Sequence, residues 1–218
     1  MAFVHTWSSK GLGSSSCVYS SAANREAFIV SRIVLTTIGS FGDLHPQMAL
    51  ALELQKRGHD VVFATHKEYQ GKIEALGFEF HRMRPDFTAL DDPQEMARMM
   101  DLQTGQEYMV RNWICPNLSE MYADLLSIAK KADFIFTGEG VTAAPLVAEK
   151  LGMRWASSAM VPFSFFSAYD PPVFAPFPVL AKLHKLGPFV NQGVINFAKL
   201  VDLGVSLPTL HHCFKALP

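Results

Sequence analysis

The sequence predicts an α/β fold: a Rossmann-like, doubly wound parallel sheet with helices on both faces. Continuous β-branched and apolar runs, typical of strands that are buried on both faces, lie at 33–38, 61–65 and 134–137. Helical segments alternate with these runs through short connections, which favours parallel strands and right-handed crossovers. Hydrophobic residues make up 49% of the 218 residues and charged residues 18%, so the chain can bury a core.

The first part of the predicted domain alternates regularly between strand and helix. Pro46 suits the first turn of a helix, and Gly58 suits its C-terminal end. A second helix is closed in the same way by Gly77. The expected elements are, in order, a strand at 33–38, a helix at 46–57, a strand at 61–65, a short helix at about 67–75 and a strand at 78–82.

The middle of the chain is less regular, and the alternation then returns. Helical spacing covers 94–101 and 106–130, where we expect an interruption at Pro116. The later elements are a strand at 134–137, a helix at 141–151 stopped by Gly152, a strand at 154–159, a proline-rich loop at 160–178 and one or two helices to about 203. We therefore expect one domain over 32–203, preceded by a disordered, serine-containing leader at 1–31 and followed by a tail at 204–218.

Composition excludes several classes of protein. Nineteen basic and twenty acidic residues give a net charge of −1, which does not favour binding to nucleic acid. The three cysteines, Cys17, Cys115 and Cys213, are far apart and form no C-x-x-C pair, so we expect neither a disulfide scaffold nor a structural zinc site. No apolar run reaches the ~20 residues of a membrane span, and no secretory signal is present. We expect a cytoplasmic protein without a transmembrane segment.

The loop after the first strand is the main candidate site. It runs from Gly39 to Pro46 and lies at the carboxyl edge of the sheet, where open α/β sheets bind ligands. Gly39 and Gly42 lack the spacing of a dinucleotide fingerprint, which weakens the case for a nucleotide-dependent oxidoreductase. Asp43 admits two interpretations of equal weight: a general base for a substrate hydroxyl, or a residue that caps the following helix. His45 is interpreted as structural or solvated.

Aromatic residues and prolines are concentrated in one segment in the second half of the chain. Seven of the 25 aromatic residues lie at 155–178 with five prolines, a poor composition for a regular element. Long irregular segments in a domain are more often functional than spacers, so we expect one wall of an apolar pocket here; a role in the core or at a domain interface is the alternative. The pocket candidates are Phe163, Phe165, Phe166 and Tyr169. Glu139 follows the strand at 134–137, at the same edge of the sheet as Asp43.

Several motifs, in order, resemble those of the family 28 glycosyltransferases. Gly39-Ser40-Phe41-Gly42-Asp43-Leu44-His45-Pro46 is similar to the G-S-x-G-D-x-x-P motif of this family, and Arg57-Gly58-His59-Asp60-Val61 to its R-G-H-x-V motif. Further similarity lies at 64–66, 76–78 and 144–152, so the resemblance covers roughly 32–200. The family includes bacterial antibiotic and macrolide glycosyltransferases and the sterol glucosyltransferases.

The resemblance implies a function and a set of site residues. It implies the amino-terminal, acceptor-binding half of a GT-B fold, with Asp43 as the base that activates an acceptor hydroxyl for inverting transfer from a nucleotide sugar. The loop residues Gly39, Ser40, Phe41 and Gly42 would shape the acceptor cleft, and Glu139 lies one position after the residue that matches a base-orienting Asp of histidine-using relatives. No metal is implied.

The donor is expected to bind elsewhere. In the family, a carboxyl-terminal domain holds the nucleotide sugar, here a UDP- or dTDP-sugar, and no donor motif is found between Gly204 and Pro218. We therefore expect a chain that is inactive alone and that transfers a hexose to a lipophilic acceptor when a donor domain or partner chain completes it. The alternatives are a non-enzymatic small-molecule-binding fragment and the acceptor subunit of a split glycosyltransferase, with peripheral contact to a membrane.

Overall fold

The chain divides into two units. The computed structural model describes residues 4–6, 30–86, 92–101, 104–160, 167–171, 173 and 178–197. Unit 1 comprises Phe3–Arg82 and Leu125–Ser158, and unit 2 comprises Met83–Asp124 and Ala159–Pro218. The single domain expected over 32–203 includes parts of both units, and its bounds stay a prediction. The expected tail at 204–218 lies outside the described residues.

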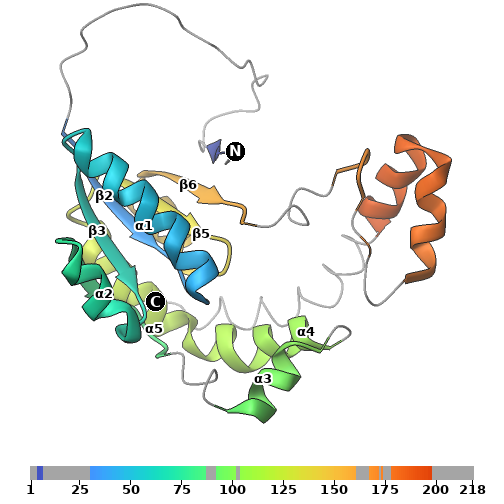
Figure 1. Ribbon diagram of the computed structural model, residues 1–218, viewed down its shortest axis with the longest axis horizontal. Coiled ribbons are helices and arrows are strands. Elements are labelled where there is room, and N and C mark those ends of the chain that lie inside the picture. Colours follow the sequence, from blue (N-terminus) through green and yellow to red (C-terminus); the bar gives the residue numbers. More distant parts are fainter. Residues whose placement is uncertain are drawn as a thin grey trace, which may run out of the picture. The chain divides into compact units, whose positions relative to one another are not determined.

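Unit 1 contains a sheet with the strand order β1-β6-β5-β2-β3-β4 (Figure 1). Its strands are β1 (Val4–Thr6), β2 (Arg32–Thr36), β3 (Asp60–Thr65), β4 (Glu79–Arg82), β5 (Phe134–Gly138) and β6 (Arg154–Ser158). Strands β2 to β6 pair in parallel, which confirms the predicted fold class. Strand β1 pairs antiparallel with β6 at the edge of the sheet, so three residues of the expected disordered leader form a strand.

The core of unit 1 lies between the sheet and its helices. The helices are α1 (Phe41–Lys56), α2 (Gln70–Ala75), which follows the short η1 (Lys67–Tyr69), and α6 (Ala143–Leu151). Alternate residues of β2 and β3 pack with apolar residues of α1 and α2, as the period of a strand requires. This buried cluster contains Ile33, Leu35, Leu44, Met48, Ala51, Val61, Phe63, Tyr69, Ile73 and Phe78.

The amino end of the sheet is joined by charged side chains. Arg32, at the start of β2, forms ion pairs with Asp60 of β3 and with Glu79 of β4, the latter at 2.6 Å. The hydrogen bond to Glu79 raises the pKa of Arg32 most, and burial opposes this shift. The carboxylate of Asp133, just before β5, accepts a hydrogen bond of 2.7 Å from the Arg32 amide. These contacts therefore align the starts of four neighbouring strands.

Most of the described part of unit 2 is helical. Its first part holds α3 (Pro93–Met99), α4 (Gly105–Met109), a π-helical turn (Val110–Ile114) and the start of α5 (Cys115–Ala129), which continues into unit 1. Pro116 does not interrupt the helical path as expected. It lies in the first turn of α5, directly after the π-helical turn, where the wider backbone spares the clash that a proline ring makes in a regular helix.

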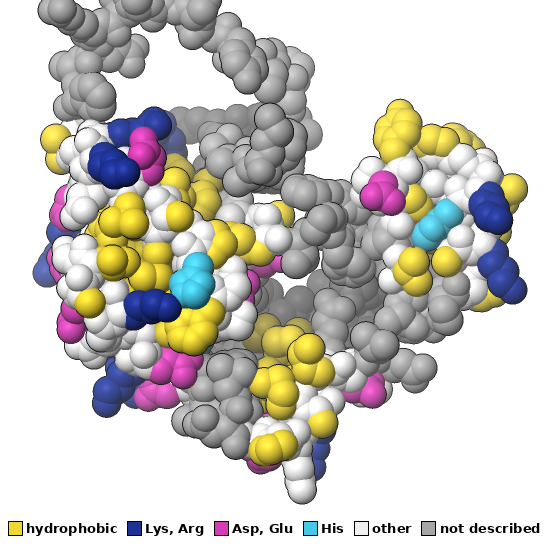
Figure 2. Space-filling view, in the orientation of Figure 1, with side chains coloured by type: hydrophobic (Ala, Val, Ile, Leu, Met, Phe, Trp, Pro, Cys, Tyr) yellow, Lys and Arg dark blue, Asp and Glu magenta, His cyan; other side chains and the backbone are white. Residues whose placement is uncertain are grey.

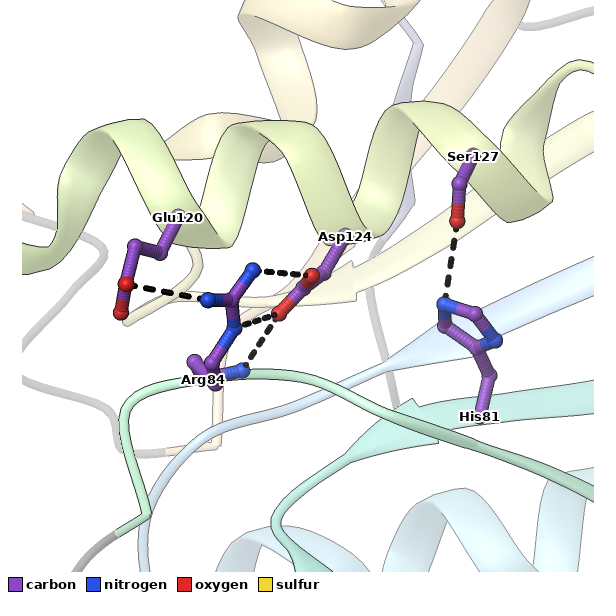
Figure 3. Close-up of polar contacts among 5 residues, drawn as sticks. All are labelled: His81, Arg84, Glu120, Asp124 and Ser127. Atoms are coloured by element: carbon purple, nitrogen blue, oxygen red, sulfur yellow. Dashed lines mark hydrogen bonds and ion pairs between the residues drawn. The ribbon is translucent and has the colours of Figure 1, made fainter.

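An arginine at the start of unit 2 fixes the chain to α5 (Figure 3). Arg84 donates to both carboxylate oxygens of Asp124, at 2.9 and 2.7 Å, and to Glu120 at 2.9 Å. Its backbone amide also donates to Asp124, at 3.0 Å. The hydrogen bonds and charge of Asp124 raise the pKa of Arg84 above its ordinary value. Within unit 1, His81 of β4 lies 3.1 Å from the hydroxyl of Ser127 on α5.

Three further observations bear on the expectations from composition. Cys115 is disulfide-bonded, which the wide spacing of the cysteines does not predict, because cysteines far apart in sequence can meet in a fold. Within the described ranges, none of the helices is long and apolar enough to cross a membrane. No cluster of three or more His, Cys, Asp or Glu side chains suited to a metal ion occurs among these residues either.

Candidate functional site

The carboxyl ends of the parallel strands bring the predicted loop residues to one edge of unit 1. Strand register places Thr36, the last residue of β2, beside Ala64 of β3 and Thr137 of β5. The loop from Gly39 therefore leaves the sheet beside η1, which follows β3, and beside the turn after β5 (Figure 1). This edge is where ligands bind in open α/β sheets.

Asp43 forms part of a capping box at the start of α1. Ser40 is the N-cap, and its hydroxyl accepts a hydrogen bond of 3.1 Å from the Gly42 amide. The Asp43 carboxylate accepts in return from the Ser40 amide at 3.0 Å and from the Ser40 hydroxyl at 3.3 Å. The helix therefore begins at Phe41, five residues before the predicted start, and Pro46 lies inside it. The capping interpretation of Asp43 is confirmed.

The capping contacts leave one carboxylate oxygen available. Both hydrogen bonds from Ser40 are accepted by Asp43 Oδ2, and the structure assigns none to Oδ1 from any described residue. The Asp43 side chain is half-buried. Capping and proton acceptance therefore do not exclude each other, because they use different oxygens of one carboxylate.

Gly39 is required by its conformation and by the position of Asp43. Its φ is +129°, which side chains rarely adopt, and a Cβ on Gly39 would lie 2.5 Å from Asp43 Oδ2. By contrast, a Cβ on Gly42 would meet only the Ser40 hydroxyl, at 3.3 Å. Of the two predicted loop glycines, Gly39 therefore determines where the carboxylate lies.

Tyr69, which the sequence analysis missed, holds the carbonyl of Gly39. Its hydroxyl donates a hydrogen bond of 2.6 Å to the Gly39 carbonyl oxygen across 30 residues, and the side chain is buried. Burial, followed by the negative charges of Glu68 and Asp43, raises the pKa of Tyr69 to about 12. Its phenol is therefore protonated at neutral pH and can act as this donor. An aromatic residue in a turn after a strand gives no sequence signal for such a contact.

Phe41 projects from the first turn of α1 into solvent. Its side chain is 51% exposed, and its ring stacks on His45 with the centroids 5.2 Å apart. Lys72 of α2 lies over the Phe41 ring, 4.4 Å from its centroid, and its ammonium is 2.8 Å from His45 Nε2. Figure 2 shows hydrophobic, His and Lys side chains together on this surface of unit 1. His45 thus has the structural and solvated role expected, and it supports the predicted loop residue Phe41.

Buried polar side chains line the sheet behind this loop. Thr65 donates to the Thr37 carbonyl at 2.7 Å, and Gln47 of α1 donates to the Thr36 carbonyl at 3.1 Å. Thr37 Oγ1 and Gln47 Oε1 are buried without a hydrogen-bond partner. A Cβ on Gly138, at the end of β5, would lie 2.9 Å from Thr37 Oγ1. The carboxyl edge therefore contains polar groups that the fold does not fully satisfy, as is common at functional sites.

The remaining predicted residues are not brought into this site by the described structure. Glu139 lies in the turn after β5, at the predicted edge, and is exposed. Phe163, Phe165 and Phe166 lie outside the described residues. Tyr169, in unit 2, is 88% exposed, in a turn where its amide donates to the Ser167 hydroxyl at 3.2 Å. The roles of these four aromatic residues and of Glu139 stay predictions.

A shallow pocket of about 470 Å³ lies within unit 2 and contains none of the predicted site residues. Its charged lining is largely paired. Arg98 forms an ion pair with Glu95, and Arg111 with Glu107, at 2.7 and 2.8 Å. Its lining residues are Ala97, Arg98, Asp101, Thr104, Glu107, Tyr108, Arg111 and Asn112.

Comparisons with known proteins agree with the resemblance seen in the sequence. Residues 33–154 match the model of the glycosyltransferase family 28 N-terminal domain. The chain is 27% identical over 152 residues to a sterol 3-beta-glucosyltransferase of Candida albicans, and 31% identical over 177 residues to UDP-sugar-dependent glycosyltransferase 52 of Dictyostelium discoideum. These matches cover 66% and 77% of this chain. The chain spans only 9% of the length of either relative.

Solved structures with a similar arrangement are also glycosyltransferases. SsfS6 of Streptomyces sp. SF2575 matches with a TM-score of 0.48 and 20% identity, over 70% of this chain and 44% of that one. The calicheamicin glycosyltransferase CalG4 matches with a TM-score of 0.46 and 16% identity, over 57% of this chain and 31% of that one.

Proposed function

Because the chain belongs to glycosyltransferase family 28 and contains that family's N-terminal domain, we propose that it is the acceptor-binding part of an enzyme that transfers a hexose from a nucleotide sugar to a hydroxyl group. The observation that supports this most directly is the geometry of Asp43. A carboxylate held through one oxygen at the carboxyl edge of the sheet offers its other oxygen to a bound hydroxyl.

In the proposed reaction, Asp43 Oδ1 accepts a hydrogen bond from the acceptor hydroxyl. The acceptor oxygen attacks the anomeric carbon while the bond from that carbon to the nucleotide phosphate breaks. The proton passes to Asp43, the nucleoside diphosphate leaves, and the anomeric configuration inverts. A carboxylate is a much weaker base than an alkoxide, so most of the proton transfer follows the start of bond cleavage. The capping contacts of Ser40 keep the carboxylate oriented during this step.

We propose a lipophilic acceptor. Phe41, which is 51% exposed in the first turn of α1, offers an apolar surface at the same edge of the sheet as Asp43. The sterol glucosyltransferases among the relatives are consistent with such an acceptor. The donor in this proposal is a UDP- or dTDP-sugar held by a further domain or by a partner chain. No metal takes part in the proposed step.

The test is product analysis with the full-length protein, by which we mean this chain together with the domain or partner chain that is proposed to hold the donor. It is incubated with UDP- and dTDP-hexoses and a panel of sterols, hydroxylated lipids and aromatic alcohols, and the coupling constant of the anomeric proton in the product is measured by NMR. We expect a glycoside of inverted configuration. Retention of configuration, or no product with any pair of donor and acceptor, would contradict the proposal.

The isolated 218-residue chain is a matched comparison in the same assay. We expect it to bind the lipophilic alcohol and to transfer no sugar, because in this proposal the groups that position the anomeric carbon and stabilise the leaving diphosphate belong to the further domain or partner chain. Turnover by this chain alone would show that it contains the donor site. Binding without turnover by the full-length protein would instead support the alternative, a non-enzymatic binding module or the acceptor subunit of a split enzyme.

A further inference from the structure

Two glycines at the end of β5 pack closely against the loop that leads to Asp43. Strands β2 and β5 are neighbours in the sheet (Figure 1). Gly138 is the last residue of β5, and Gly140 lies in the turn after it. A Cβ on Gly138 would lie 2.9 Å from Thr37 Oγ1, and a Cβ on Gly140 would lie 2.9 Å from Ile38 Cγ1. These contacts therefore leave no room for a side chain at either glycine.

The fold needs these two glycines for space and not for backbone freedom. Unlike Gly39, neither Gly138 nor Gly140 has a positive φ, so the backbone there is one that alanine can adopt. The turn is also held in place, because the Gly138 carbonyl accepts hydrogen bonds from the Thr137 hydroxyl at 2.9 Å and from the Val141 amide at 3.4 Å. A methyl group added at either glycine must therefore be accommodated at least in part by the loop.

The loop is held differently on its two sides. On the side of β3, the Thr65 hydroxyl donates to the Thr37 carbonyl at 2.7 Å, and the Tyr69 hydroxyl donates to the Gly39 carbonyl at 2.6 Å. On the side of β5, the Thr37 hydroxyl is buried and finds no hydrogen-bond partner among the described residues. Hydrogen bonds therefore fix the loop from one side, and close packing against glycines fixes it from the other.

From these contacts we propose that Gly138 and Gly140 are positioning residues for Asp43. They let the turn after β5 support the loop at a distance that a side chain would not allow. The loop residues that they contact directly precede Gly39 and Ser40, which determine where the Asp43 carboxylate lies. Because a packed interior transmits displacements, a shift of these loop residues moves the carboxylate. The inference rests on the proposed function, in which Asp43 is the base, and neither glycine takes part in the chemistry.

The first test measures the kinetics of Gly138→Ala and Gly140→Ala in the full-length protein. A misplacement of about 1 Å can cost on the order of 100-fold in rate, so the smaller shift expected here should lower kcat roughly 10-fold, with the KM for the acceptor nearly unchanged. Gly71→Ala is the matched control. Gly71 lies in α2 without a positive φ, and a Cβ there meets nothing within 4 Å, so this variant should keep the kcat of the parent.

A second readout does not depend on sugar transfer. The Ser40 amide donates to Asp43 Oδ2 at 3.0 Å, so its hydrogen exchange, measured by NMR, reports whether this contact is kept. The amide should exchange faster in Gly138→Ala and Gly140→Ala than in the parent and in Gly71→Ala. A parent that transfers no sugar would contradict the proposed function. Unchanged exchange of the Ser40 amide in both variants would overturn the inference, whether or not the parent is active.

Rescue by a smaller neighbour separates this contact from a general loss of stability. Thr37→Ala removes the oxygen that a Cβ at position 138 would meet, and this oxygen has no described hydrogen-bond partner to lose. Gly138→Ala combined with Thr37→Ala should therefore regain most of the lost kcat, whereas the combination with Thr37→Val, which keeps the volume, should not. Melting curves establish that each variant is folded. The inference is overturned if both glycine variants keep the parent kcat, if Gly71→Ala loses as much, or if Thr37→Ala restores nothing.

Discussion

The two ends of the parallel sheet in unit 1 differ in what their polar residues do. At the amino end, Arg32 joins Asp60 and Glu79 in ion pairs whose carboxylates are half-exposed, so water and salt share in their solvation. Buried polar atoms without a described hydrogen-bond partner occur at both ends: Arg32 Nε at the amino end, and Thr37 Oγ1 and Gln47 Oε1 at the carboxyl end. At the carboxyl end, threonines and Gln47 are fully buried, and Gly39 has a positive φ. One end therefore aligns the strands. At the other end, buried polar groups and a positive φ lower the stability of the fold and position Asp43.

We expect the largest effect on stability and turnover when a methyl group is added at Gly39. Gly39→Ala should destabilise unit 1 by roughly 1–3 kcal/mol, because alanine is strained at this φ and its Cβ displaces Asp43 Oδ2. Turnover of the full-length protein should fall as well. Gly58→Ala is the matched control, since Gly58 also has a positive φ but a Cβ there meets nothing within 4 Å. Equal turnover in the two variants, measured beside their melting temperatures, would show that Gly39 does not position the base.

Removal of the Tyr69 hydroxyl should have the next largest effect. Tyr69→Phe leaves the Gly39 carbonyl without this donor. The free energy of unfolding, measured with denaturant, should fall by about 1–2 kcal/mol. Turnover should fall as well, because the loop that begins at Gly39 holds Asp43. A parent and variant with the same stability and turnover would show that this hydrogen bond contributes nothing.

The pH dependence of stability provides a separate readout for Tyr69. The pKa of Tyr69 is raised from 10.0 to about 12 in the folded protein, so the folded state keeps a proton that the unfolded state has lost between these values. The stability that this residue contributes is therefore complete below about pH 10 and is lost as pH rises towards 12. In Tyr69→Phe this part of the pH profile should be flatter than in the parent. Identical slopes would mean that the phenol is not buried as the structure shows.

The smallest effect is expected at the amino end of the sheet. Glu79→Gln removes one partner of Arg32, and because Glu79 is half-exposed the free energy of unfolding should fall by less than about 1 kcal/mol. The difference should shrink further in 0.5 M NaCl, and turnover should not change. A loss of turnover comparable to that of Gly39→Ala would remove the distinction between the two ends.

The sequence predicts those features that depend on local pattern. Continuous β-branched runs identified the parallel strands, and the position of the Gly39 loop at the carboxyl edge followed from their direction. The start of α1 was misplaced because Pro46 was interpreted as a first-turn residue, whereas the reciprocal contacts of Ser40 and Asp43 begin the helix at Phe41. Tyr69 was missed because its partner lies 30 residues away. The division into two units arises from long-range packing, which has no local pattern.

The central claim is that Asp43 acts as a base and not only as a cap. Asp43→Asn keeps the size of the side chain and an oxygen that can accept from the Ser40 amide, but it removes the basicity of the carboxylate. In the full-length protein it should lower kcat by roughly 10²–10⁴, with acceptor affinity and melting temperature nearly unchanged. Asp60→Asn, the same substitution at the amino end, should lower stability slightly and leave kcat near that of the parent. An Asp43→Asn variant that keeps more than half of the parent kcat would contradict the account and leave Asp43 a structural residue.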